Sequence, residues 1–149
     1  MKRLNAFTLT AILVAGTALA HSGVKNPAVK ARMDAMMAIG KETKTLGEMA
    51  KGAMPFDLKA AQTAAAAIAD HAASTPGLFE ANETDPKSEA KASIWVNFDD
   101  FTAKATELEV VAKDLSSSIT SSDDLGSAMM ALGATCKSCH AAYREKTQP

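Results

Sequence analysis

The chain has 149 residues and a formal net charge of −1, and hydrophobic residues make up 47% of it while aromatic residues make up 5%. Such a mild charge argues against nucleic acid or an anionic membrane surface as a partner. Abundant alanine, together with leucine, methionine, lysine and glutamate, is typical of a helical protein, and the length suits one ordinary domain.

The first 20 residues have the three parts of a secretory signal peptide. Lys2 and Arg3 form the charged start, an uncharged apolar run covers residues 6–15, and Ala18-Leu19-Ala20 is a small-residue cleavage site. The apolar run is shorter than the roughly 20 residues of a membrane-spanning helix, and no later stretch is long enough. We therefore predict cleavage after Ala20, a mature domain of residues 21–149 without a membrane span, and export to the periplasm of a bacterium.

Two amphipathic helices are predicted in the first half of the mature chain. Asn26-Pro27 is a helix start signal and Gly52 is a stop signal, so the first helix covers residues 27–51, with apolar and small residues at three-four spacing. Asp57 caps a second helix that ends near residue 74. Its many alanines predict close packing against another helix, either of this chain or of a second subunit.

Two further helices are predicted after a loop over residues 75–85, which Pro76-Gly77 marks. Asp85-Pro86 repeats the cap-then-proline signal and predicts a third helix to about residue 115. A fourth helix begins after Ser122 or Asp123. Charged residues that lie off the apolar stripe of the third helix are assigned to a solvated face: Asp99, Asp100, Lys104, Glu107 and Glu109. Four amphipathic helices joined by short connections predict an all-α, antiparallel four-helix bundle.

The last predicted helix carries Cys136-Lys137-Ser138-Cys139-His140, the attachment motif of c-type haem. The two thiols are expected to form thioethers with the porphyrin, and His140 to donate a ring nitrogen to the iron from the proximal side. Residues three and four apart share one helix face, so all three point toward one porphyrin. A redox Cys-x-x-Cys should lie near a βαβ pattern, and a closed zinc site needs four ligands; neither context is present.

The motif lies in the last helix and is followed by Ala141-Ala142-Tyr143-Arg144, and in this the sequence resembles the class II c-type cytochromes, the family of cytochrome c-prime. Supporting matches are Arg32, the stretch 51–57 and the stretch 91–95. The resemblance covers essentially the whole mature chain. It implies an up-down-up-down bundle with one covalently bound haem c, and often a homodimer through the first two helices.

The resemblance also implies roles for three residues of the haem environment. Arg32 would lie near the haem propionates or the proximal histidine, Arg144 close to His140, and Trp95 near the haem edge. The alternatives are an exposed Arg32 and a Trp95 that only packs in the core with its N–H hydrogen-bonded.

The family divides at the sixth iron ligand, and Met36 aligns with that position. With its sulfur on the iron, the protein would be a low-spin carrier that exchanges single electrons with redox partner proteins in the periplasm. With Met36 only filling space, the iron would stay five-coordinate and bind nitric oxide or carbon monoxide. We predict the electron carrier, with the gas binder as the alternative.

An enzyme such as a peroxidase is not predicted. That chemistry needs a general acid–base, usually a histidine, poised over the bound peroxide. The first helix contains no histidine, and His71 in the second helix is isolated.

Overall fold

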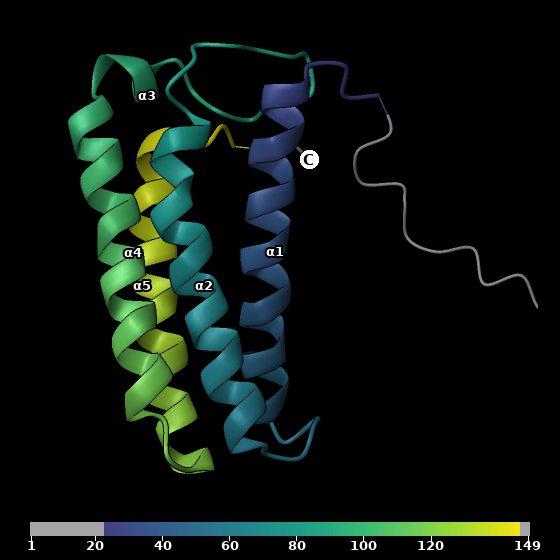
Figure 1. Ribbon diagram of the computed structural model, residues 1–149, viewed down its shortest axis with the longest axis vertical. Coiled ribbons are helices and arrows are strands. Elements are labelled where there is room, and N and C mark those ends of the chain that lie inside the picture. The colour runs from purple at the N-terminus through teal and green to yellow at the C-terminus, as the bar shows by residue number, and fades with distance from the viewer. Residues whose placement is uncertain (1–22, 147–149) are drawn as a thin grey trace, which may run out of the picture.

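The computed structural model describes residues 23–146 as a bundle of four long helices that run alternately up and down (Figure 1). The elements are α1 (Pro27–Ala50), α2 (Leu58–Leu78), α3 (Ser93–Val96), α4 (Phe98–Ser118), the 3-10 helix η1 (Ser122–Asp124) and α5 (Leu125–Tyr143). The predicted all-α antiparallel bundle is confirmed. The predicted signal peptide and its cleavage site lie outside the described residues. Within the described range, no helix combines the length and apolarity needed to cross a membrane.

Helix α1 begins and ends at the signals in the sequence. The side chain of Asn26 accepts hydrogen bonds from the backbone N–H groups of Ala28 and Val29, at 2.9 and 3.1 Å, as an N-terminal cap does. Gly52, just beyond the helix, has a φ of 69°, a left-handed conformation that glycine adopts without a Cβ clash. The predicted bounds are therefore confirmed to within one residue.

Helix α2 continues past Thr75, where the sequence predicted a loop. Its start agrees with prediction, because Asp57 accepts a hydrogen bond from the N–H of Ala60 at 2.8 Å. Pro76 lies in the last turn, where its missing N–H removes a single helical hydrogen bond. The continued helix buries Thr75 and brings Phe79 into the core. The predicted helix end was wrong because this packing outweighs one proline.

The third long helix, α4, begins well after Asp85-Pro86, so the predicted start was wrong. The Asp85 carboxylate accepts hydrogen bonds from the N–H groups of Lys87, Lys25 and Asn26, and these bonds hold the pKa of Asp85 below its usual value. The carboxylate therefore links the connection between α2 and α3 to the start of α1 by hydrogen bonds, instead of capping a helix. We call this connection, residues 79–92, the crossing loop.

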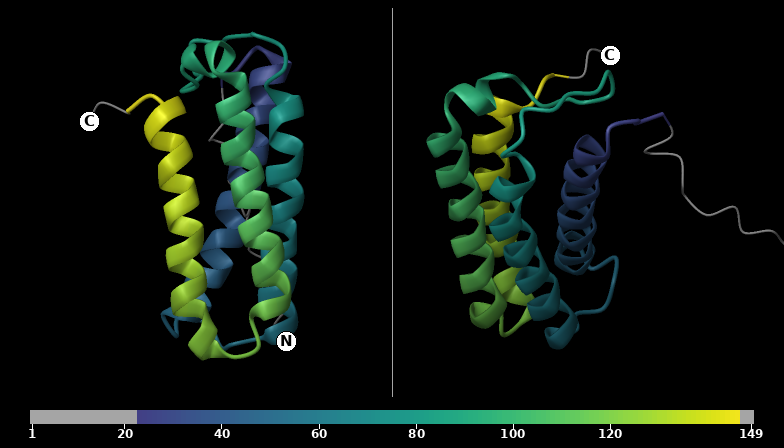
Figure 2. Two further views of the ribbon diagram at one scale, coloured as in Figure 1. Left: turned by 90° about the vertical axis from the view of Figure 1, so that its left-hand side faces the viewer. Right: turned by 45° about the horizontal axis from the view of Figure 1, so that its top comes forward.

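The far part of the crossing loop is extended because it pairs with the end of α5. The N–H of Lys91 donates to the carbonyl of Tyr143 at 2.9 Å, and the N–H of Glu145 donates to the carbonyl of Glu89 at 2.7 Å. A helix over these residues would lose this pairing. The loop thus covers the end of the bundle where α5 finishes (Figure 2).

The start of α5 lies close to its prediction. Ser121 and Asp124 form the capping box of η1. Helix α5 follows directly, and its own cap position is Asp124, a residue or two after the predicted Ser122 or Asp123. The N–H groups of Thr120 and Ser121 lower the pKa of Asp124. The connection from α4 is therefore tight, and it turns the chain back along the bundle.

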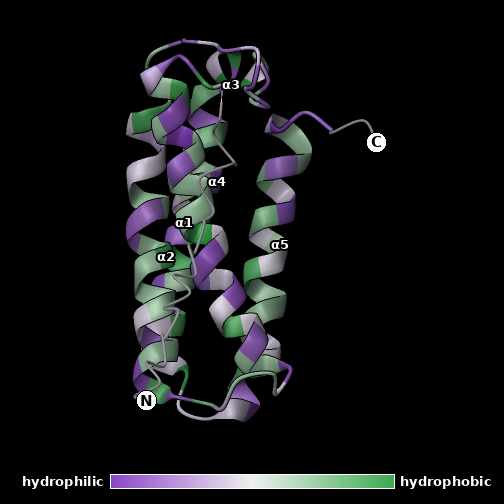
Figure 3. Ribbon diagram, turned by 90° about the vertical axis from the view of Figure 1, so that its right-hand side faces the viewer, coloured by the Kyte–Doolittle hydropathy of each residue, from purple (hydrophilic) through white to green (hydrophobic). Residues whose placement is uncertain are grey.

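Buried apolar side chains form two clusters along the bundle. The larger, which we call the aliphatic cluster, includes Leu46, Ile68 and Leu132 and takes in alanines of α2. The predicted close packing of the alanine-rich face thus occurs within this chain. The smaller, the aromatic cluster, consists of Phe79, Ile94, Phe101 and Tyr143. Each long helix carries both hydrophobic and hydrophilic residues (Figure 3), as amphipathic helices do.

Candidate haem site

A cavity of about 630 Å³ lies beneath the crossing loop. Residues of all four long helices and of the crossing loop contribute to its walls, and most of its lining surface is apolar, from side chains such as Val29, Ile39, Phe101 and Leu108. Cofactor and ligand sites are typically apolar cavities of roughly 300–1,000 Å³ with a few polar groups. The cavity therefore has the size and the chemistry of such a site.

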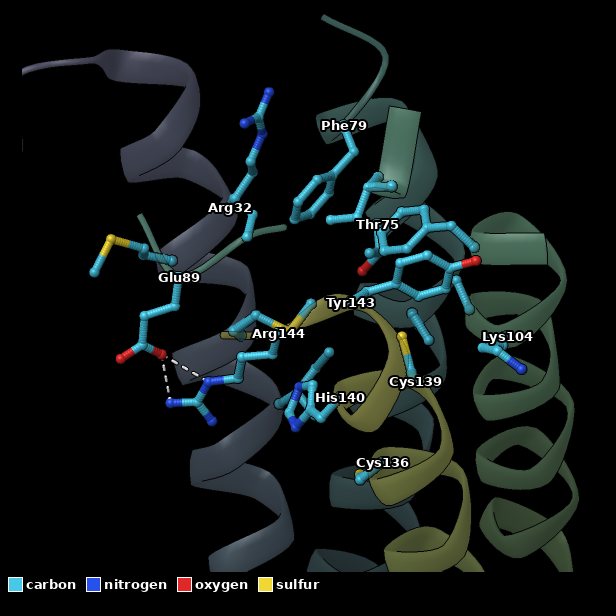
Figure 4. A pocket seen from close by; sticks show the side chains of 18 of the residues that line it. Arg32, Thr75, Phe79, Glu89, Lys104, Cys136, Cys139, His140, Tyr143 and Arg144 are labelled. Atoms are coloured by element: carbon cyan, nitrogen blue, oxygen red, sulfur yellow. Dashed lines mark hydrogen bonds and ion pairs between the residues drawn. The ribbon is translucent and has the colours of Figure 1, made fainter. Parts of the chain in front are cut away.

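Cys136, Cys139 and His140 line one wall of the cavity, on the last turns of α5 (Figure 4). Both cysteines are half-buried free thiols, and burial raises the pKa of each. Burial also lowers the pKa of His140, as does the nearby Arg144 guanidinium, while Glu89 opposes them. A neutral imidazole is the form that binds a metal. The helix thus presents two thiols and one imidazole to the same space, and the His140 side of the site is open to solvent.

Three methionines of α1, Met33, Met36 and Met37, line the cavity from another side. Met36 also packs against the aliphatic cluster, whereas Met37 is 47% exposed. Gly40, one turn after Met36, leaves open space where a Cβ would lie. The structure therefore brings Met36 and His140 to one cavity from two helices that are far apart in sequence.

Arg32 lines the cavity, and its buried guanidinium bonds backbone carbonyls of the crossing loop and of the end of α2. Its Nε donates to the carbonyl of Leu78 at 2.9 Å, Nη1 to that of Glu83 at 2.8 Å and Nη2 to that of Ala81 at 2.5 Å. Burial lowers the pKa of Arg32, and the carboxylate of Glu83 opposes this. Arg32 is only 3% exposed, so the alternative of a surface cation is wrong. The guanidinium points away from His140 (Figure 4), and a role toward the haem propionates stays a prediction.

Trp95 is not among the residues that line the cavity. Its Nε1 donates to the carbonyl of Phe79 at 2.8 Å, and its ring centroid lies 6.5 Å from that of Phe79. Phe79 itself does line the cavity. Trp95 therefore packs behind a wall residue with its N–H satisfied, and a contact between Trp95 and the haem edge stays a prediction.

Arg144 follows the last residue of α5 and lines the cavity beside His140 (Figure 4). Its backbone N–H donates to the carbonyl of His140 at 3.1 Å. Its Nε and Nη2 lie 2.7 and 2.6 Å from the same oxygen, Oε2 of Glu89 in the crossing loop. Sequence reasoning missed Glu89, because no local pattern marks a loop carboxylate that reaches the end of another helix.

Asp100 and Lys104, assigned from sequence to a solvated face, belong to the surroundings of the site. The hydroxyl of Tyr143 donates to Oδ2 of Asp100 at 2.6 Å, and the ammonium of Lys104 lies 3.6 Å from Oδ1 of Asp100. Lys104 and Tyr143 both line the cavity. The hydrogen bond to Asp100, reinforced by burial, raises the pKa of Tyr143 to about 12. This network joins α4 to α5 at the level of Cys139.

The residues of the cavity fit a covalently held haem. Apolar walls suit a porphyrin, two thiols three residues apart suit its two vinyl groups, and an imidazole follows the second thiol directly. A second sulfur-bearing side chain, Met36, shares the cavity. Nothing in this set of residues conflicts with the cofactor that the motif predicts.

Comparisons with known proteins identify one family. Residues 27–144 match the family model described as Cytochrome C'. The chain is 39% identical over 120 residues to the cytochrome c' of Pararhodospirillum photometricum, an alignment that covers 78% of this chain and 95% of the relative. It is 34% identical over 140 residues to the cytochrome c-556 of Agrobacterium fabrum, covering 93% and 95%.

A solved structure has the same fold. Cytochrome c' from Rhodopseudomonas palustris superimposes with a TM-score of 0.77 at 28% identity, over 83% of this chain and all of that one. The family model spans nearly all of the described residues, from the first turn of α1 to the residue after α5. The chain therefore belongs to the cytochrome c' family of class II c-type cytochromes, and its cofactor is the covalently attached haem c of that family.

Proposed function

We propose that this protein is an exported monohaem cytochrome that transfers single electrons. Cys136 and Cys139 are the thioether attachment points, His140 is the proximal iron ligand and Met36 is the distal ligand. One observation carries the proposal: Met36 of α1 lines the same cavity as these three residues of α5. Bound haem iron supplies a one-electron couple between its ferrous and ferric states.

The contribution of the chain is to keep the two ligand side chains in place in both oxidation states. Met36 packs against the aliphatic cluster. The carbonyl of His140 accepts a hydrogen bond from the N–H of Arg144. Each ligand therefore lies on a helix that is held by further contacts. Most of the lining surface of the cavity is apolar. Methionine–histidine ligation also raises the reduction potential of a c-type haem. Little therefore has to move when an electron arrives or leaves.

The alternative is a five-coordinate protein that binds nitric oxide or carbon monoxide. Both cytochromes c' and cytochromes c-556 are among the relatives, so family membership does not choose between the two functions. Methionine is a flexible filler of apolar space. If Met36 only packs, α1 presents apolar side chains to the distal side, which suits a small neutral gas.

None of the described residues that line the cavity supports a peroxidase function. Among the described residues that line the cavity, His140 is the only histidine, and His71 is not one of them. A general acid–base opposite the proximal ligand would have to come from elsewhere. This favours a carrier or a gas binder over an enzyme.

Optical spectra of the oxidised and reduced protein, with and without carbon monoxide, test the proposal. An electron carrier should give a low-spin spectrum with a methionine–iron charge-transfer band that carbon monoxide leaves unchanged. A high-spin spectrum that shifts with carbon monoxide would contradict the proposal and establish the gas binder.

Substitution of Met36 identifies the ligand. Met36→Ala should convert the low-spin spectrum to high-spin and open a carbon monoxide site, because the sulfur is lost. Met33→Ala and Met37→Ala are matched controls, since both residues also line the cavity, and both variants should stay low-spin. Conversion in Met33→Ala alone would assign the distal ligand to Met33 instead.

Export, partners and assembly complete the proposal. We expect the mature protein in the periplasm, where it meets redox partner proteins, and a homodimer through α1 and α2. Cell fractionation tests the first expectation, and sedimentation of the haem-loaded protein tests the last.

A further inference from the structure

The ion pair between Glu89 and Arg144 lies in the wall of the haem cavity. Both side chains line it, and two guanidinium nitrogens of Arg144 bond one carboxylate oxygen of Glu89 at 2.7 and 2.6 Å, as Figure 4 shows. The ion pairs Lys30–Asp34 and Lys44–Glu48 of α1 differ, because none of their four residues lines the cavity.

The crossing loop does not need this ion pair to reach α5. Backbone hydrogen bonds already join residues 89–91 to residues 143–145, from the N–H of Lys91 to the carbonyl of Tyr143 and from the N–H of Glu145 to the carbonyl of Glu89. An exposed ion pair adds little to stability, typically about 0–1 kcal/mol. Attachment of the crossing loop to α5 therefore does not explain why an ion pair is present at this place.

The position of Arg144 beside the proximal ligand indicates an electrostatic role for the ion pair. It lies one helical turn after His140, whose carbonyl accepts the Arg144 N–H. A positive charge at this place disfavours the oxidised cofactor, because ferric iron carries one more positive charge than ferrous iron. The carboxylate of Glu89 supplies the opposite charge at the same wall.

We propose that Glu89 is a positioning residue that holds the Arg144 guanidinium and neutralises its charge beside His140, and that it thereby sets the reduction potential of the bound haem. The inference rests on the proposed function only for haem attachment through Cys136, Cys139 and His140. It holds for either identity of the sixth ligand. The side chains of Arg144 and Glu89 are 50% and 40% exposed, so salt weakens the effect.

Reduction potentials of haem-loaded variants test the proposal. Glu89→Gln should favour the ferrous state about threefold to tenfold at a fixed solution potential, where tenfold corresponds to about 59 mV for a one-electron couple. Arg144→Gln should shift the ratio by a similar factor in the opposite direction. The double variant should return close to the wild-type potential, and Glu89→Asp, which keeps the charge, should stay near it.

Two controls separate this effect from a general one. Glu107→Gln makes the same chemical change at an exposed site of α4 outside the cavity wall, and it should leave the potential nearly unchanged. The shifts of both single variants should shrink as ionic strength rises from about 0.01 M to about 1 M, since the Debye length falls from about 30 Å to about 3 Å.

The outcomes are distinct. Shifts of Glu89→Gln and Arg144→Gln in the same direction, or no larger than that of Glu107→Gln, would overturn the inference and leave the proposed function intact. If Glu89→Gln fails to fold, Arg144→Gln and the salt dependence decide in the same way. A wild-type protein without the mass of covalent haem would overturn the proposed function, and this inference with it.

Discussion

The two halves of the bundle use the same four helices and pack them differently. In the half that contains the turn after α1 and the start of α5, large side chains such as Leu46, Ile119 and Leu125 are fully buried, together with alanines of α2. In the half beneath the crossing loop, the helices surround a cavity of about 630 Å³, next to the aromatic cluster. One half holds the helices together and the other holds the cofactor.

The half beneath the crossing loop is the one that depends on the haem for its packing. Protein interiors are close-packed, and the cost of an unfilled cavity rises with its volume. A dry apolar cavity made by a single engineered substitution measures about 150 Å³, far less than this one. We therefore expect the half beneath the crossing loop to become ordered with its cofactor, and the half around the aliphatic cluster to keep the bundle together without it.

Removal of both cysteines should have the largest effect, because it should remove the haem and loosen only the half beneath the crossing loop. Cys136→Ala with Cys139→Ala should abolish covalent haem, because no thiol is left to form a thioether, and each single variant should keep at most one thioether. Mass spectrometry measures attachment. Hydrogen exchange should then rise in the crossing loop far more than near Leu46. Covalent haem in the double variant would contradict the assignment of the site.

A substitution in the aliphatic cluster should destabilise the bundle and leave the haem site unchanged. Leu46→Ala removes a side chain that is 0% exposed, and we expect it to lower the free energy of unfolding by about 2–5 kcal/mol while the haem spectrum stays the same. Denaturant unfolding measures the loss. Val110→Ala, at a residue that is 52% exposed, is the control with little expected change. A spectral change in Leu46→Ala would show that the two halves are coupled.

Loss of Arg32 should have a smaller effect, confined to the half with the crossing loop. Arg32→Ala leaves three backbone carbonyls without their donors. The expected loss in free energy of unfolding is about 1.5–3 kcal/mol, the range of one hydrogen bond to a charged group. The free energy of unfolding of Arg32→Lys should lie between those of the wild type and Arg32→Ala, because lysine keeps the charge but lacks the planar fork of donors. Lys30→Ala is the exposed control, and equal losses in Lys30→Ala and Arg32→Ala would refute this account.

The smallest effect concerns the pH dependence of stability. The Asp100 carboxylate and burial raise the pKa of Tyr143 to about 12, above its ordinary value of about 10. The stabilisation is therefore complete below about pH 10 and is lost as the pH rises from about 10 to about 12. Tyr143 is the only tyrosine of the chain, so tyrosinate absorbance follows it directly.

The matched variants for this titration are Asp100→Asn and Asp99→Asn. Asp100→Asn should lower the pKa of Tyr143 toward its ordinary value, because it removes the negative acceptor of the hydroxyl. Asp99→Asn, at an exposed neighbour, should leave that pKa nearly unchanged. Equal shifts in the two variants would mean that the general charge of α4, rather than the hydrogen bond, acts on Tyr143.

Local signals determined much of this molecule from the sequence alone. The helix-start signals Asn26-Pro27 and Asp57 and the stop signal Gly52 act through their own backbone neighbours, and the structure has each of them where it was predicted. Apolar periodicity predicted the four-helix bundle because burial of one face is a property of each helix by itself. The Cys136–His140 motif predicted the cofactor because its spacing already suits one helix face.

Contacts between residues far apart in the chain could not be read from the sequence, because they depend on how the helices pack. Asp85-Pro86 has the pattern of a helix start, yet its carboxylate bonds the beginning of α1, because those N–H groups are brought to it by the fold. The pairing of Glu89 with Arg144, the hydrogen bond of Tyr143 to Asp100, and the entry of Met36 into the cavity of His140 arise in the same way. A local pattern specifies how a segment prefers to fold, whereas the partner of a side chain is set by the packing of whole helices.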